Sequence, residues 1–188
     1  IDSTNSCVVC QVGILPYAEE FTYGADLVLR VPPDLMIEVF NAGGEISSDS
    51  LCQSIWARAL SGPVNLRNVH GDVDVATSDD SLSLVSVFGS VAGSTTNAPI
   101  TAGVILPPTN GHCRLETTNG AVILRLQTSV SDRIYARPVT ATVTVSGLEI
   151  QYLVRQPDRI EGVMGSGSNN VYVSTSNRSI ALYGFKYP

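Results

Sequence analysis

Charged residues are scarce in this sequence, at 15% of the chain, and cations are scarcer than anions. Lysine and arginine total 11 against 17 aspartates and glutamates, so the net charge is −6 at pH 7. Neutralising a nucleic-acid backbone or docking on an anionic bilayer requires clustered cations, and the chain has no basic block. We therefore expect no nucleic-acid partner and no attachment to a membrane surface.

Long apolar runs are also missing. No uninterrupted run approaches the ~20 residues that a membrane-spanning helix needs, so we expect no membrane insertion. Hydrophobic residues nevertheless make up 44% of the chain, which excludes a disordered polyelectrolyte and favours a protein with a sizeable core. No charged-then-apolar leader precedes the first residues, and we interpret the chain as a secreted or cell-surface protein whose signal peptide has been removed.

Cysteines number only four, at Cys7, Cys10, Cys52 and Cys113. An even number in an exported protein favours disulfides, and we expect Cys7 and Cys10 to be tied to Cys52 or to each other. Cys113 is the expected free thiol because it occupies an apolar position of the repeat described next. A metal or redox site on the Cys7/Cys10 pair is the alternative, but no second close pair or matching histidines accompany it. We expect no metal and no cofactor.

A repeat organises most of the chain. A twelve-residue window has apolar or small residues at positions 1, 3, 10 and 12 around a polar turn, as in Val73, Val75, Leu82 and Leu84. Windows begin at residues 37, 55, 73, 91, 113, 134 and 171, and the first four starts are 18 residues apart. The last gap equals about two coils, the first of them degenerate near Tyr152. A period of roughly 20 residues is typical of a solenoid.

Each window predicts two short strands joined by a corner. Apolar and polar residues alternate within each half, which places one side of a strand inward. The fifth position is often threonine, and turn formers such as Asn119 and Gly120 follow it. The threonines at this position are Thr77, Thr95, Thr117 and Thr175.

The repeat predicts an all-β, single-stranded β-solenoid, a parallel β-helix of about 7–8 coils of 18–22 residues, and we expect the right-handed form. We assign residues 27–188 to the solenoid and residues 1–26 to an N-terminal segment that caps the stack or is exchanged with a neighbour. Two alternatives remain open. Short strands with Gly/Pro turns also suit an antiparallel β-sandwich, and Asp49 to Gly62 can be read as a helix.

Several of these stretches resemble a bacterial adhesin-like family of β-solenoids whose repeats carry a Thr-x-Asn-Gly-hydrophobic corner. The matching stretches run from Leu27 to Pro32, from Asn65 to Val73, from Glu116 to Val122, and from Gly165 through Val171 to Asn177. The resemblance covers about residues 27 to 184. It implies a β-solenoid on the cell surface and supplies no catalytic residues.

Histidines are too few to indicate catalysis. His70 and His112 each lie beside a glycine at an expected corner, 42 residues apart, and no nucleophile or set of metal ligands converges on them. We expect both to be exposed corner residues.

The richest acidic cluster consists of Asp72, Asp74, Asp79 and Asp80. Paired carboxylates on a solenoid face do acid/base work or bind calcium in β-helical carbohydrate-active enzymes. Asp79 and Asp80, however, lie at a corner where aspartate is ordinary turn chemistry, and no Gly-Gly-x-Gly-x-Asp repeat is present. We expect no catalytic residues, and structural calcium at this cluster is the alternative.

Two single residues suggest surface roles. Asn177-Arg178-Ser179 fits the N-glycosylation sequon at an accessible corner. Trp56, the only tryptophan, has the outward phase of its strand, where an indole can stack on a sugar or contact a protein.

The expected function is therefore that of an extracellular, non-enzymatic, adhesin-like or structural surface protein. Head-to-tail assembly is one form of it, because the terminal coils of a stack expose unpaired N–H and C=O groups. The residues expected at such a junction are Val8, Val9, Val12 and Ile14 at one end and Tyr183, Phe185 and Tyr187 at the other. The alternatives are a monomeric module that binds a surface glycan or protein and, less favoured, a carbohydrate-active enzyme on a β-helix.

Overall fold

A computed structural model describes residues 28, 30–32, 35–129 and 131–186. The chain divides into two compact units, Ile1–Val31 and Pro32–Pro188, and every strand below lies in the second unit. The expected N-terminal cap, the four junction residues from Val8 to Ile14, Cys7, Cys10 and Tyr187 lie outside the described residues.

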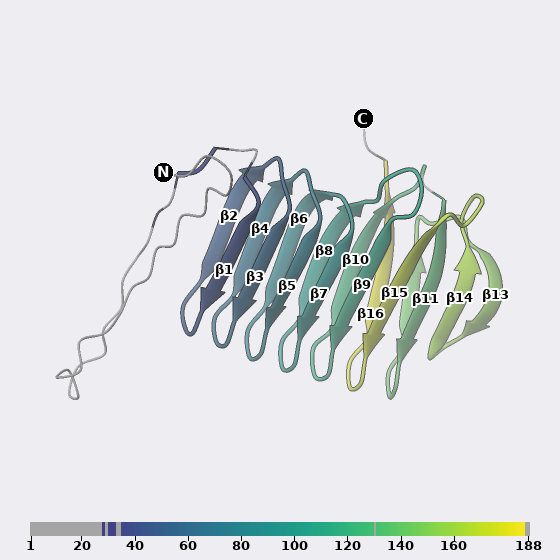
Figure 1. The fold of residues 1–188 in the computed structure, drawn as a ribbon. Helices are drawn as coiled ribbons and strands as arrows, with labels where there is room; N and C mark the ends of the chain where they lie inside the picture. The colour runs from purple at the N-terminus through teal and green to yellow at the C-terminus, as the bar shows by residue number, and fades with distance from the viewer. Residues whose placement is uncertain (1–27, 29, 33–34, 130, 187–188) are drawn as a thin grey trace. The chain divides into compact units, whose positions relative to one another are not determined.

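The second unit is an all-β parallel solenoid, as the repeat predicts, and its described residues contain no helix (Figure 1). One sheet, sheet A, has nine strands and the other, sheet B, has seven. In stacking order, sheet A consists of β1 (Ile37–Asn41), β3 (Ile55–Ala59), β5 (Val73–Thr77), β7 (Val91–Thr95), β9 (His112–Thr117), β15 (Asn169–Thr175), β11 (Asp132–Pro138), β14 (Arg159–Val163) and β13 (Gln151–Gln156). Sheet B consists of β12 (Val143–Ser146), β16 (Ile180–Phe185), β10 (Val122–Gln127), β8 (Ile100–Ile105), β6 (Leu82–Phe88), β4 (Val64–Val69) and β2 (Ile46–Leu51), read from the other end.

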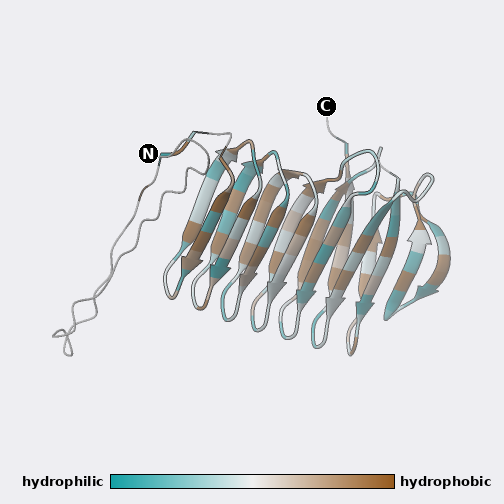
Figure 2. Cartoon of the chain, in the orientation of Figure 1, coloured by the Kyte–Doolittle hydropathy of each residue, from teal (hydrophilic) through white to brown (hydrophobic). Residues whose placement is uncertain are grey.

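Each coil gives one strand to each sheet, and the 18-residue spacing sets the register. Ile55 pairs with Val73, and Val73 with Val91, so equivalent window positions stack directly. The inward side chains form the core between the sheets, which appears as alternating bands of hydropathy along the strands (Figure 2). Val73, Val75, Val122 and Leu124 are at most 2% exposed, as the repeat requires. The antiparallel sandwich is therefore wrong, and so is the helix over 49–62, where β2 and β3 lie.

Threonine at the fifth window position ties each corner to the neighbouring coil. The buried hydroxyls of Thr77, Thr117 and Thr175 donate to the carbonyl oxygens of Gly62 (2.9 Å), Ala98 (3.2 Å) and Gly120 (2.8 Å), respectively. A buried carbonyl without a partner would cost about 1–3 kcal/mol, so these hydroxyls support the corner directly.

A ladder of side-chain amides runs along the same edge of the stack. Asn97 donates to Asp79 at 2.6 Å, Asn119 donates to Asn97 at 2.7 Å, and Asn177 donates to Asn119 at 2.6 Å. We call these four residues the amide ladder. Its last step joins residues 58 positions apart, because the coils do not stack in chain order.

The last coil in sequence lies inside the stack. β15 pairs with β9 on one side and β11 on the other, and β16 lies between β10 and β12. We call β15, β16 and their corner the inserted coil. The expectation that this coil ends the stack, with Tyr183 and Phe185 at a junction, is therefore wrong. Both residues belong to a strand that is paired along both edges.

The corner residues explain the insertion. The inserted coil has Thr175 and Asn177, which continue the threonine and amide ladders of β9 and its corner. The coil of β11 and β12 has Pro138 in register with Thr175, and a proline side chain has no donor for that carbonyl. Stacking the inserted coil on β9 therefore satisfies more corner groups than stacking β11 there.

The far end of the stack is closed by a hairpin. The degenerate coil expected near Tyr152 is instead the antiparallel pair β13–β14, which adds two strands to sheet A only. Pro157-Asp158 forms the turn, and such a pair favours tight chain reversal over a wider coil corner. Seven coils thus remain, followed by a hairpin that buries Ile160 against the core.

Candidate functional site

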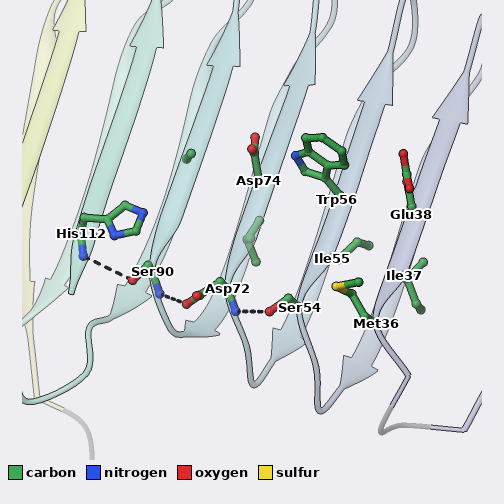
Figure 3. A pocket seen from close by; sticks show the side chains of 12 residues that line it. Met36, Ile37, Glu38, Ser54, Ile55, Trp56, Asp72, Asp74, Ser90 and His112 are labelled. Carbon is green, nitrogen blue, oxygen red and sulfur yellow. Dashed lines mark hydrogen bonds between the residues drawn. The ribbon is translucent and has the colours of Figure 1, made fainter. Parts of the chain in front are cut away.

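A groove of about 290 Å³ crosses the outer face of sheet A over β1, β3, β5 and β7 (Figure 3). Glu38, Trp56 and Asp74 form its upper row, because these outward positions pair in register on adjacent strands. The 18-residue period therefore places an indole between two carboxylates, about 4.8 Å from each along the sheet.

Arg58 contacts two members of this row, Trp56 and Asp74. Its guanidinium lies 5.2 Å from the centroid of the Trp56 ring, donates to a carboxylate oxygen of Asp74 at 2.7 Å, and donates to the Asp74 carbonyl at 3.0 Å. The indole remains 48% exposed. A planar guanidinium can stack on a ring while its nitrogens donate to other groups, so Arg58 holds Trp56 on the surface in a set orientation.

A polar row forms the lower side of the groove (Figure 3). The Asp72 amide donates to Ser54 Oγ at 3.2 Å, the Ser90 amide donates to Asp72 Oδ1 at 2.8 Å, and the His112 amide donates to Ser90 Oγ at 3.4 Å. These bonds link the corners of four successive coils. The row is thus built into the backbone of the stack, which makes the groove rigid.

A second aromatic and arginine pair lies further along the same face. The Arg114 guanidinium is 5.5 Å from the Tyr172 ring centroid and donates to Glu116 at 2.9 and 3.1 Å. The hydrogen bonds and charge of Glu116 raise the pKa of Arg114. Between the two pairs, β5 and β7 present the small side chains Ala76 and Ala92. β3 and β9 are three strand spacings apart, or about 14 Å, so the two pairs are separate features of the same face.

A smaller hollow of about 130 Å³ follows on the same face, lined by Tyr135, Arg137, Glu161 and Tyr172 among others. Both of these hollows open on the outer face of sheet A. The aromatic and charged side chains of this face come both from the inserted coil and from the other strands of sheet A.

The acidic cluster is divided by the fold. Asp72 and Asp74 line the groove, whereas Asp79 and Asp80 lie at the opposite end of β5. Asp79 accepts from Asn97, and Asp80 accepts from the Ser81 amide at 2.7 Å. The described residues contain no group of three His, Cys, Asp or Glu residues that could hold a metal ion.

The two histidines have different surroundings. His112 lies in the groove, and His70 stacks on Phe88 with the ring centroids 4.2 Å apart. Both are exposed, as the sequence predicts, but only His70 lies at a corner, since His112 is the first residue of β9.

Cys113 is a buried free thiol, as predicted, and burial together with the charge of Asp132 raises its pKa to about 12. Cys52 is an exposed free thiol, so it does not pair with Cys7 or Cys10. The other expected pairing, Cys7 with Cys10, lies outside the described residues.

The sequence did not single out the polar junction at the start of the inserted coil. The Asn169 side chain donates to Asp132 Oδ1 (3.0 Å) and the Pro107 carbonyl (3.1 Å), and accepts from the Gly111 amide (2.9 Å). Asp132 is fully buried, its Oδ2 has no hydrogen-bond partner, and burial raises its pKa despite the bond from Asn169. Each residue comes directly before an apolar strand pattern, and only the insertion brings them together.

Asn177, the glycosylation candidate, is exposed at its corner, but its side-chain nitrogen belongs to the amide ladder. None of the described residues forms a helix of the length and apolar character that a membrane crossing requires. Comparison with protein-family models, curated proteins and solved structures finds no match to this chain.

Proposed function

We propose that this protein is an extracellular, non-enzymatic binding module that holds a glycan in the groove beside Trp56. The observation that carries the proposal is the row Glu38–Trp56–Asp74, in which an oriented, half-exposed indole lies between two carboxylates. An aromatic face packs against the C–H face of a sugar ring, and flanking carboxylates accept hydrogen bonds from its hydroxyls. The proposed cell-surface location is the one that the resemblance of the corner motifs to adhesin-like β-solenoids implies.

The groove is suited to binding more than to glycoside hydrolysis. Hydrolysis needs one carboxyl group as a general acid and a second as a base or nucleophile on opposite sides of the bond. Asp74 is engaged by Arg58, and Asp72 accepts a bond from the backbone of the next coil. Both carboxylates therefore have positioning roles in the sheet, and we assign neither of them to acid/base work.

Glycan arrays, followed by titration calorimetry with the best glycan, test the proposal on the full chain. Trp56→Ala should weaken binding by about tenfold, since an aromatic contact contributes roughly 0.5–1.5 kcal/mol beyond its buried area. Tyr183→Ala is the matched control. Tyr183 is 41% exposed on the outer face of sheet B and lies under Arg125, with 6.0 Å between the guanidinium and the ring centroid. Equal losses in both variants, or no glycan bound at all, would contradict the proposal.

A structural protomer is the second candidate, and the open edge of the stack favours it. Among the described residues, β1 pairs only with β3 and β2 only with β4, so no described strand covers their outer edges. The other end differs, because the hairpin extends sheet A two strands beyond sheet B. Because the two ends do not match, contact between like ends is favoured over head-to-tail stacking, and contact between like ends gives a finite assembly. Sedimentation over a wide concentration range distinguishes the two forms.

A further inference from the structure

The inserted coil is hydrogen-bonded to a neighbouring coil on both sides. Its inward side chains, Val171, Val173, Ile180 and Leu182, are fully buried. β15 and β16 each pair with two strands, and Asn169, Thr175 and Asn177 add side-chain bonds to the neighbouring coils. The space between β9/β10 and β11/β12, which we call the slot, is therefore complementary to one specific sequence, residues 169–185.

The strands that flank the slot are connected to each other in sequence without passing through the inserted coil. β11 and β12 follow β10 in sequence through residues 128–131, and the inserted coil enters only later. Residues 164–168, which we call the hinge, connect it to the β14 side of the hairpin. Every other contact between the inserted coil and the slot is a hydrogen bond or apolar packing.

Four of the five hinge residues tolerate a different path, whereas Met164 is buried in the core and its amide donates to the Asp132 carbonyl at 2.7 Å. Gly165 and Gly167 have positive φ angles of 57° and 71°, and they alternate with Ser166 and Ser168. The Ser166 amide donates to Ser131 Oγ at 3.2 Å, and Ser168 Oγ lies 3.3 Å from the Ser131 carbonyl. The four residues 165–168, if extended, reach about 14 Å, which equals about three strand spacings in a sheet.

We propose that the slot also accepts the inserted coil of a second copy of this chain, so that two molecules exchange residues 169–185 in a reciprocal dimer. The exchanged coil makes the same ladder, corner and core contacts as in the single chain. Only the hinge changes, so the two forms differ little in energy and concentration selects between them. The exchange is independent of the groove and does not rest on glycan binding.

Split cysteine pairs test the exchange. One chain carries Glu116→Cys on β9 and a differently tagged chain carries Ser174→Cys on β15, because these two outward residues are register partners across the slot. Cys7, Cys10 and Cys52 are changed to Ser in every chain, and Cys113 stays because it is buried. The two chains are mixed, unfolded, refolded over a range of concentrations and then oxidised with glutathione.

The matched control splits Glu116→Cys and Ser94→Cys between two chains. Ser94 is the register partner of Glu116 on its other side, in β7, which the exchange leaves in its own chain. We expect the dimer fraction to rise with concentration and the slot pair to give about tenfold more inter-chain disulfide than the control pair. Gly165→Ala should increase the exchanged fraction, because a Cβ there would lie 2.5 Å from Ser131 Oγ in the unexchanged hinge.

A single chain that carries both Glu116→Cys and Ser174→Cys shows whether the geometry can form the bond. If this chain closes its disulfide while the split slot pair gives no more inter-chain product than the control pair at any concentration, the exchange does not occur. Dimers that cross-link equally in both split pairs would indicate contact between the outer faces of sheet A of two molecules, because all three positions lie on that face. This result would also overturn the proposal.

Discussion

The side-chain nitrogen of Asn177 donates to the side-chain oxygen of Asn119 at 2.6 Å, across 58 positions of sequence. The same bond joins Asn119 to Asn97, which is 22 positions away in the preceding coil. The amide ladder therefore continues from the corner of β9 and β10 directly into the corner of the inserted coil. Local corner chemistry, and not chain order, decides which coils stack.

The threonine corners can be tested by removing one hydroxyl. Thr175→Val keeps the shape of the side chain but leaves the Gly120 carbonyl, which now accepts at 2.8 Å, without its partner. We expect the free energy of unfolding to fall by about 1–3 kcal/mol. Chemical denaturation measures it, and Ser94→Ala on the outward face is the control. A stability equal to that of the unsubstituted chain would mean that the corner bond contributes nothing net.

Gly120 should tolerate no side chain. A Cβ at this position would lie 1.7 Å from the carbonyl oxygen of Ala98, so the corner must move apart. We expect Gly120→Ala to destabilise the fold by about 3 kcal/mol or more, at the upper end of overpacking costs.

Gly103→Ala is the comparison for this clash. The nearest atom to a Cβ there is 3.7 Å away, and the residue lies within a strand. Alanine should therefore be neutral or stabilise by up to about 1 kcal/mol. Thermal denaturation of both variants checks the pair, and equal melting temperatures would show that the corner is looser than described.

Asp132 should make stability depend on pH. Burial raises its folded pKa above the ordinary value of 3.8, so its protonated form fits the fold. The stability it contributes is fully present below about pH 3.8 and is lost as the pH rises through the folded pKa. Asp132→Asn removes this loss, so the variant should be more stable than the parent at pH 7.

Denaturation of both chains between pH 4 and pH 8 measures the effect of Asp132. The gain should be about 1 kcal/mol or more at pH 7, since a neutral amide at this position does not titrate and can still accept the bond from Asn169. The difference between the two chains should shrink toward pH 4. A difference that does not change with pH would show that the folded pKa of Asp132 is not raised above its unfolded value.

The two described thiols should react very differently with an alkylating reagent. Cys52 is exposed, whereas Cys113 is buried and its pKa is raised to about 12. Since the thiolate is the reactive form, iodoacetamide at pH 8 should modify Cys52 and leave Cys113 unmodified until the protein unfolds. Peptide mass spectrometry reads both sites. Rapid modification of Cys113 in the folded protein would contradict its position in the core.

Much of the fold follows from the repeat, because equal spacing puts equivalent residues in register. The windows that start at 37, 55, 73 and 91 begin with strands that pair with one another, and the inward side chains of Val73 and Leu124 are buried in the core. The insertion could not be predicted in this way, since any two coils with matching windows are compatible neighbours. Only the detail of the corners, Thr175 and Asn177 against Pro138, separates the two orders.

The groove, too, was predictable from the sequence only in part. The outward phase of Trp56 was predictable from strand alternation, and Arg58 shares its face two residues later. The pairing of Arg58 with Asp74 and not with another aspartate depends on the exact coil length, which places position 74 one strand away. The hairpin was missed because a loose match at Tyr152 resembles a coil, and the Pro157-Asp158 turn overrides it.

The place of the inserted coil also constrains how a newly made chain reaches its final structure. Synthesis delivers β11 through β14 before β15 and β16, so the segments that flank the slot exist while the slot is still empty. During that interval β9 and β10 on one side and β11 and β12 on the other present unpaired parallel edges, which recruit foreign strands. A nascent chain in a crowded cell therefore has a vulnerable period that ends only when residues 169–185 emerge and dock.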